Sequence, residues 1–177
     1  MASTQKVLEN PATGEKIVFR RTAEETGGEV LEYELFFRPQ GFLVREHLHP
    51  GQSERHEVLS GKLGLHLGGE NRVLEPGDAV VVPAATPHRL FPVGDGQVQA
   101  LFELRPALRT EQLLETFVRL ARDGKVDGKG NPRPFELALI AREFEPEGYA
   151  TKPPLAVQHL LLAPLAWLAK LFGRSLD

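Results

Sequence analysis

Short segments with strand character follow one another through the first 106 residues of this 177-residue chain. In residues 31–37, every second residue is apolar, and Glu32 and Glu34 lie between them. This alternation is the period of a strand with one buried face. A Glu-Pro-Gly-Asp turn leads into residues 79–82, an apolar and largely β-branched run that we expect to lie deep in a sheet. Many short strands at regular spacing predict a sandwich or a barrel. The other predicted strands are 42–49, 55–59, 63–67, 89–91 and 97–104.

After residue 106 the pattern becomes helical. Thr110 can cap a first helix, because its hydroxyl can accept a hydrogen bond from a free backbone N–H of the first turn. Two further helices are predicted at 135–144 and 155–172. We therefore expect an all-β domain at residues 1–106 and a helical C-terminal extension at 107–177, packed on the β domain or at a dimer interface.

The segment 155–172 is strongly apolar and nearly as long as a membrane span. A spanning helix needs about 20 mostly apolar residues, whereas this segment is interrupted by Gln158, His159, Pro164 and Lys170. We therefore expect a helix packed against protein, with Pro164 as a kink or break, and no membrane partner.

Composition excludes several kinds of site. The chain has no cysteine, so any metal ligands must be His, Asp or Glu side chains. Its 24 acidic and 21 basic residues give a net charge of −3 without a cluster of Lys or Arg, so we expect no nucleic-acid partner.

The N-terminal residues lack the apolar core of a signal peptide, which favours a cytoplasmic protein, although a protein with its targeting segment removed would look the same.

Five of the six histidines lie between positions 47 and 88. His47 and His49 are two residues apart, so in a strand their rings point to the same side. The following Pro-Gly-Gln-Ser turn can bring Glu54 back beside them on the adjacent strand. Two imidazoles and one carboxylate are a known facial arrangement for a metal ion with open coordination positions. His88 follows a proline-bounded turn and becomes a fourth ligand if the sheet closes on itself.

Two neighbouring residues are secondary candidates for catalysis. His56 should face the same side as Glu54; it would be an acid, a base or an extra ligand, or else a polar residue that fills the barrel by hydrogen bonding to a neighbour. Arg45 should share the face of His47; it would clamp a substrate carboxylate or pair with a glutamate at the rim. His66 alternates with leucines, and we expect it to point to solvent.

The same positions fit two motifs through which the chain resembles the cupin superfamily. The first motif is Gly, five residues, His-x-His, three or four residues, Glu, six residues, Gly, and it is complete here. The second is Gly, five residues, Pro-x-Gly, two residues, His, three residues, Asn, in which Ala85 and Pro92 replace the second Gly and the Asn. Neither is a ligand position, so these departures concern the local turn more than the metal. The matching residues are Gly41, His47, His49, Glu54, Gly61, Gly77, Pro83 and His88.

The resemblance implies a small antiparallel jelly-roll barrel in which His47, His49, Glu54 and His88 bind one divalent ion. Iron, manganese, nickel, zinc, copper and cobalt all suit nitrogen and oxygen ligands. The resemblance supports two classes of function. One is a metal-dependent enzyme that acts on a small polar molecule. It would be either an oxygenase, such as a dioxygenase, or an isomerase. The other is a non-catalytic module that binds or senses a small molecule. Sheet edges invite pairing, so we also expect a homodimer.

Overall fold

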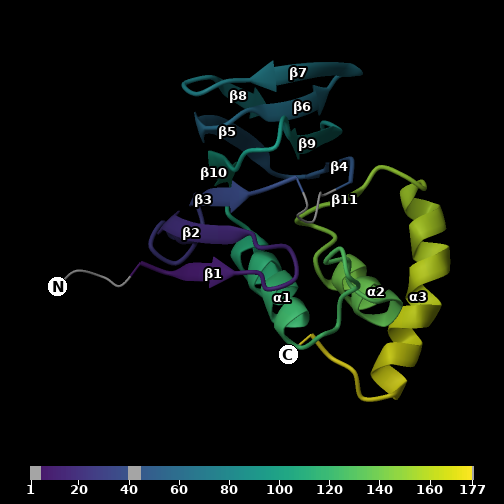
Figure 1. Ribbon diagram of the computed structural model, residues 1–177. Coiled ribbons are helices and arrows are strands. Elements are labelled where there is room, and N and C mark those ends of the chain that lie inside the picture. Colours follow the sequence, from purple (N-terminus) through teal and green to yellow (C-terminus); the bar gives the residue numbers. More distant parts are fainter. Residues whose placement is uncertain (1–4, 40–44, 177) are drawn as a thin grey trace.

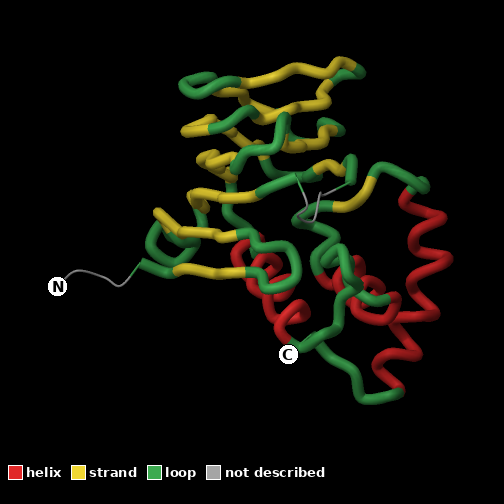
Figure 2. The backbone as a smooth tube through the Cα atoms, in the orientation of Figure 1, coloured by secondary structure: helices red, strands yellow, loops and turns green. Residues whose placement is uncertain are grey.

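The computed structural model describes residues 5–39 and 45–176, which form two antiparallel sheets and a group of three helices (Figure 1). The strands gather in one part of the molecule and the helices in the other (Figure 2). This confirms the expected jelly-roll fold with a C-terminal helical part. The six-stranded sheet has the order β1 (Val7–Glu9), β2 (Lys16–Arg21), β3 (Leu31–Phe37), β10 (Val98–Arg105), β5 (Ser53–Ser60) and β8 (Ala79–Val82). The five-stranded sheet has the order β11 (Tyr149–Ala150), β4 (His47–Leu48), β9 (His88–Pro92), β6 (Leu63–Leu67) and β7 (Glu70–Leu74).

Alternate residues of the central strands form the core between the two sheets. The register of β3 and β10 places Tyr33 opposite Phe102 and Leu31 opposite Leu104, and all four are buried. Tyr33 and Phe102 stack, with ring centroids 5.2 Å apart. Leu63 of the other sheet belongs to the same apolar cluster. Burial of one such side chain stabilises the fold by about 1.5–3 kcal/mol, so the alternation seen in the sequence is what holds the sheets together.

Residues 79–82 form β8, but the prediction that they lie deep in a sheet is wrong. β8 is the last strand of the six-stranded sheet and pairs with β5. Val81 is 57% exposed and only Val82 is fully buried. β-branched residues are favoured in any strand, at an edge as well as in the centre, so this composition indicates a strand without fixing its place in the sheet.

Other strand predictions have mixed outcomes. The predicted strand at 42–49 appears as β4, which is only His47–Leu48, while residues 42–44 and Gly41 of the first motif lie outside the described residues. β3 and β6 have the predicted bounds. Four strands of the described residues were not predicted: β1, β2, β7 and β11. Of these, β11 is important for the site, and it comes from the C-terminal extension.

The helices are α1 (Thr110–Arg122), α2 (Pro134–Glu143) and α3 (Leu155–Leu171). α2 and α3 pack on each other, and α3 lies on the outer side of the molecule (Figure 1). Pro164 lies inside α3 and does not end it. Among the described residues, no helix combines the length and the apolar character that crossing a membrane requires. The apolar residues buried between the helices include Leu120, Leu139, Ile140, Phe144, Ala166 and Ala169.

Thr110 begins α1, but the predicted cap is not formed by its side chain. The hydroxyl is buried and hydrogen-bonds to Gln52, whose Nε2 lies 2.9 Å from Thr110 Oγ1. Gln52 Nε2 also donates to the carbonyls of Pro106 and Ala107, at 2.8 and 3.0 Å. Gln52 belongs to the turn between His49 and Glu54. These hydrogen bonds therefore join the start of the extension to that turn.

The position of β8 at the edge of the sheet can be tested by measuring the free energy of unfolding of two variants. Leu31→Ala removes a side chain that is 0% exposed, and we expect the free energy of unfolding to fall by about 2–5 kcal/mol. Val81→Ala, at the exposed edge, should change it by no more than about 0.5 kcal/mol. Urea unfolding of both variants measures the difference. Equal losses would mean that Val81 is buried in the folded protein.

Candidate metal centre

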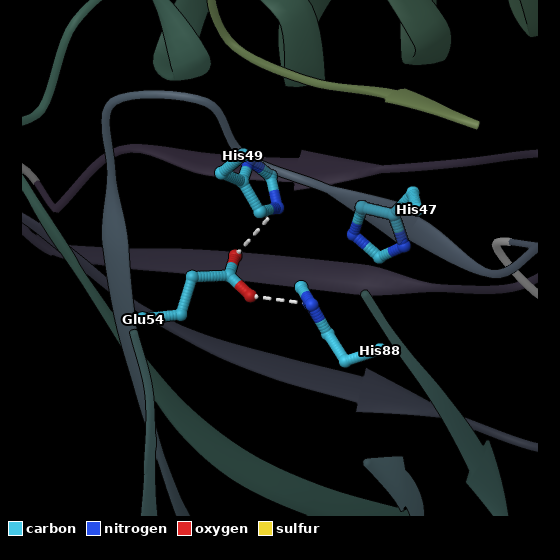
Figure 3. A group of neighbouring side chains, drawn as sticks. All are labelled: His47, His49, Glu54 and His88. Carbon is cyan, nitrogen blue, oxygen red and sulfur yellow. Dashed lines mark ion pairs between the residues drawn. The ribbon is translucent and has the colours of Figure 1, made fainter. Parts of the chain in front are cut away.

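Four predicted ligands from three strand regions meet between the two sheets. His47 lies on β4 and pairs with His88 at the start of β9, while His49 follows β4 directly. Glu54 comes from β5 of the opposite sheet, where it is one of the buried residues of an alternating strand. One ligand atom from each of the four lies within 4.8 Å of every other. Figure 3 shows the carboxylate of Glu54 between the rings of His49 and His88.

The distances within the group are short. Glu54 Oε1 lies 3.2 Å from His49 Nε2, and its Oε2 lies 2.9 Å from His88 Nε2. The ring centroids of His47 and His88 are 4.4 Å apart. Imidazoles this close repel one another when protonated, so the arrangement disfavours two charged rings beside each other.

Each histidine of the group uses Nδ1 for a hydrogen bond to a backbone carbonyl. His47 Nδ1 is 3.0 Å from the carbonyl oxygen of Arg45, and His88 Nδ1 is 3.0 Å from that of Thr86. His49 Nδ1 donates to the carbonyl oxygen of Glu147. A carbonyl oxygen only accepts, so Nδ1 carries the proton and Nε2 keeps its lone pair. This fixed tautomer is the one that metal-binding histidines use when Nε2 is the ligand atom.

The Nε2 atoms of His49 and His88 are buried and make no hydrogen bond to any residue of the described chain. Both lie close to Glu54 without forming a hydrogen bond to it. A buried polar atom without a partner costs about 1–3 kcal/mol. One divalent ion would satisfy both nitrogens and the carboxylate together, so the residues present fit a metal site.

Burial and mutual contact shift the pKa values in the group. Burial alone would raise the pKa of Glu54, but the contacts with His56 and His88 and the charge of His49 outweigh it and hold that pKa well below the usual range. Burial, together with repulsion from His88 and His49, lowers the pKa of His47 to about 4. For His88, burial lowers the pKa, but the contact with Glu54 outweighs it, so the net shift is upward. At neutral pH, Glu54 is therefore ionised and His47 is neutral.

His56 is next to the group, as its spacing from Glu54 predicts. The side chain is completely buried, and Nε2 lies 3.3 Å from Glu54 Oε2. Its ring packs edge-on against Phe102, with centroids 4.7 Å apart. The hydrogen bond expected of a polar filler is absent, since neither ring nitrogen has a hydrogen-bond partner among the described residues. A catalytic role for His56 stays a prediction.

The other two predictions concern residues at the rim. Arg45 is exposed, and its carbonyl orients His47; the role of its guanidinium stays a prediction. His66 is outside the four-residue group, and it lies on the partly exposed face of β6, opposite exposed Asn71 and Arg89, as its alternation with buried leucines predicts. It is half-buried, with Nδ1 2.8 Å from Asn71 Oδ1 and Nε2 3.6 Å from Glu46.

Two residues that contact the site could not be identified from any sequence pattern. Glu147 supplies the carbonyl for His49 from 98 residues further along the chain. Gly148 lies so close that a Cβ atom there would be 3.1 Å from His49 Nδ1. Both precede the short strand β11, whose two residues carry no strand pattern long enough to detect.

Comparison with known proteins places this site in a family. Residues 34–102, which include all four converging residues, match the family model of the cupin domain. Residues 34–102 are a cupin domain. Both the barrel and the His-x-His…Glu…His pattern of this domain are those that the sequence resemblance implied.

Two solved structures support the fold, and one curated protein matches part of the sequence. An RmlC-like cupin from Shewanella frigidimarina NCIMB 400 is 18% identical, with a TM-score of 0.50, over 63% of this chain and 92% of that one. A predicted oxalate decarboxylase from Thermotoga maritima is 18% identical, with a TM-score of 0.50, over 59% of this chain and 94% of that one. The polyketide synthase CurC of Streptomyces cyaneus is 33% identical over 66 residues, which are 37% of this chain and 43% of the relative. The match therefore spans less than half the length of that curated relative.

The coupling between Glu54 and His88 can be tested in the metal-free protein. NMR titration should show that His47 changes protonation near pH 4. His88 should change protonation at a pH above the usual pKa of a histidine. Glu54→Gln removes the negative charge that stabilises protonated His88, so the pKa of His88 should fall. Glu57→Gln is the control, because Glu57 is on the same strand and pairs with Arg55 instead. If Glu54→Gln leaves the pKa of His88 unchanged, the two side chains are not in contact.

Proposed function

We propose that this protein binds one divalent metal ion and acts as a metal-dependent enzyme on a small polar molecule. The observation that carries the proposal is the convergence of the ligand atoms within 4.8 Å, with every Nδ1 held by a carbonyl. The ligands are Nε2 of His47, His49 and His88 and a carboxylate oxygen of Glu54. Iron, manganese, nickel, zinc, copper and cobalt all fit this donor set.

The chain's own residues would orient the substrate and control water. When bound, the ion supplies Lewis-acid or redox chemistry at the coordination positions that the protein leaves open. Glu54 and His88 are buried, whereas His47 and His49 are only partly buried, so we expect a substrate to approach from the side of His47 and His49. Arg45, exposed beside it, would bind a carboxylate of the substrate. Buried His56 and Phe102 close the opposite side against water.

An oxygen-rich substrate suits this site best. Keto acids and phenolic acids present oxygen atoms that bind divalent ions, and a carboxylate for Arg45. The curated relative carries the name polyketide synthase, and polyketides are rich in carbonyl and phenolic oxygens, which supports testing this class first. Oxygenase and isomerase reactions are the two types we propose.

The second candidate is a non-catalytic module that binds or senses a small molecule. It is favoured by the contact between the extension and the site, because Glu147 touches His49 and could transmit an effect of ligand binding to the helices. A homodimer would give those helices a partner and stays a proposal, as does the absence of nucleic-acid and membrane partners.

Metal content tests the ligand assignment. His49→Ala and Glu54→Ala should each remove most of the bound metal, because each deletes a ligand. His66→Ala is the matched control and should keep it, since His66 is outside the group. Elemental analysis of freshly purified proteins measures the metal-to-protein ratio. Loss of as much metal from His66→Ala as from His49→Ala would show that the assignment is wrong.

Oxygen uptake distinguishes the two functions. The iron-loaded protein should consume oxygen with one of a panel of phenolic and keto acids, and His49→Ala should not. Product analysis of the same panel under nitrogen detects an isomerase. Tight binding of a panel member without turnover in every metal form would instead support the binding module.

A further inference from the structure

Residues 147–151 run beside the strand that carries the first metal ligand. Within this segment β11 pairs with β4 in antiparallel register, with Tyr149 opposite Leu48 and Ala150 opposite His47. Next to it, the backbone N–H of Thr151 donates to the carbonyl of Glu46 at 3.0 Å. The C-terminal extension therefore supplies part of the sheet that carries His47 and His88.

The segment also reaches the second ligand directly. The carbonyl oxygen of Glu147 accepts the hydrogen bond from His49 Nδ1. At Gly148 an added Cβ atom would be 3.1 Å from both His49 Nδ1 and the carbonyl oxygen of Leu48. That is closer than an ordinary van der Waals contact, so the absence of a side chain allows this approach.

His49 differs in this respect from the other two histidines. His47 and His88 take their carbonyl acceptors from residues two positions earlier in the chain, Arg45 and Thr86. Those acceptors are local and belong to the cupin domain itself. The acceptor for His49 is 98 residues away, in the extension.

Glu147 is held in place through Arg109, which is itself fixed against the end of α2. Its side chain is buried, and Oε1 accepts a hydrogen bond from the backbone N–H of Arg109 at 3.2 Å, just before α1. The Arg109 guanidinium lies 4.8 Å from the ring centroid of Phe144 and binds Glu143 Oε1 at 2.9 Å, at the end of α2. The position of the Glu147 carbonyl is therefore determined by the packing of the helices.

We propose that residues 147–151 of the extension are a positioning element of the metal centre. The Glu147 carbonyl sets the tautomer and the ring orientation of His49, and Gly148 permits that contact. The inference rests on the proposed metal-binding function. Partners of this kind, which orient a ligand without touching the metal, typically change metal affinity by 10- to 100-fold when they are removed.

Cobalt(II) titration of matched glycine variants tests this inference. Gly148→Val should push the segment away from His49 and weaken Co²⁺ binding about tenfold or more, measured by visible absorption. Gly128→Val is the control, because Gly128 lies in the same extension with nothing within 4 Å of an added Cβ, and it should bind Co²⁺ as the unchanged protein does. Thermal unfolding followed by circular dichroism shows whether both variants are folded.

The ring nitrogens of His49 give a readout that a purely structural role would not change. In the metal-free protein, long-range ¹H–¹⁵N spectra should show His49 protonated at Nδ1. The milder Gly148→Ala, which serves if Gly148→Val does not fold, should shift the His49 signals and leave those of His88 in place.

The outcomes separate the two claims. If the unchanged protein does not bind Co²⁺, the proposed function fails. If it binds, and the Gly148 variants keep both the affinity and the His49 signals, the positioning role is overturned. Weaker binding with unchanged His49 signals would overturn it as well, because the effect would not pass through His49.

Discussion

The rest of the structure depends on one buried carboxylate, that of Glu54, and on the imidazoles that surround it. Its side chain is 7% exposed, with ring nitrogens of His49, His56 and His88 at 3.2, 3.3 and 2.9 Å from its oxygens. Ionised carboxylates are costly to bury without such partners. Glu54 belongs to one sheet and His88 to the other, so this electrostatic contact joins the sheets at the point where a cation would be held.

The site could be predicted from the sequence because its ligands are carried by local patterns. The His-x-His spacing puts His47 and His49 on one face of a strand, and the turn after them returns Glu54 to the same place. His88 follows its own turn at the start of β9. Period-two alternation likewise predicted β3 with its observed bounds, because one buried face leaves a clear pattern.

Features that depend on contacts between distant segments could not be predicted in this way. Val81 has the residue type of a central strand, yet its exposure depends on which strand comes last in the sheet. β11 is two residues long and exists because β4 offers it an edge. The contact of Glu147 with His49 depends on how the helices pack, and the extension, predicted from sequence as helical and packed on the β domain or at a dimer interface, also adds a strand to the sheet of His47 and His88.

Anomalous diffraction from a crystal of freshly purified protein, collected at the absorption edge of the metal found in it, tests the central claim most directly. The account predicts one strong peak between the two sheets, at about 2.0–2.2 Å from Nε2 of His47, His49 and His88 and from an oxygen of Glu54. A crystal soaked in Co²⁺ or Zn²⁺ that shows no peak there, or a peak bound to other residues, would contradict it.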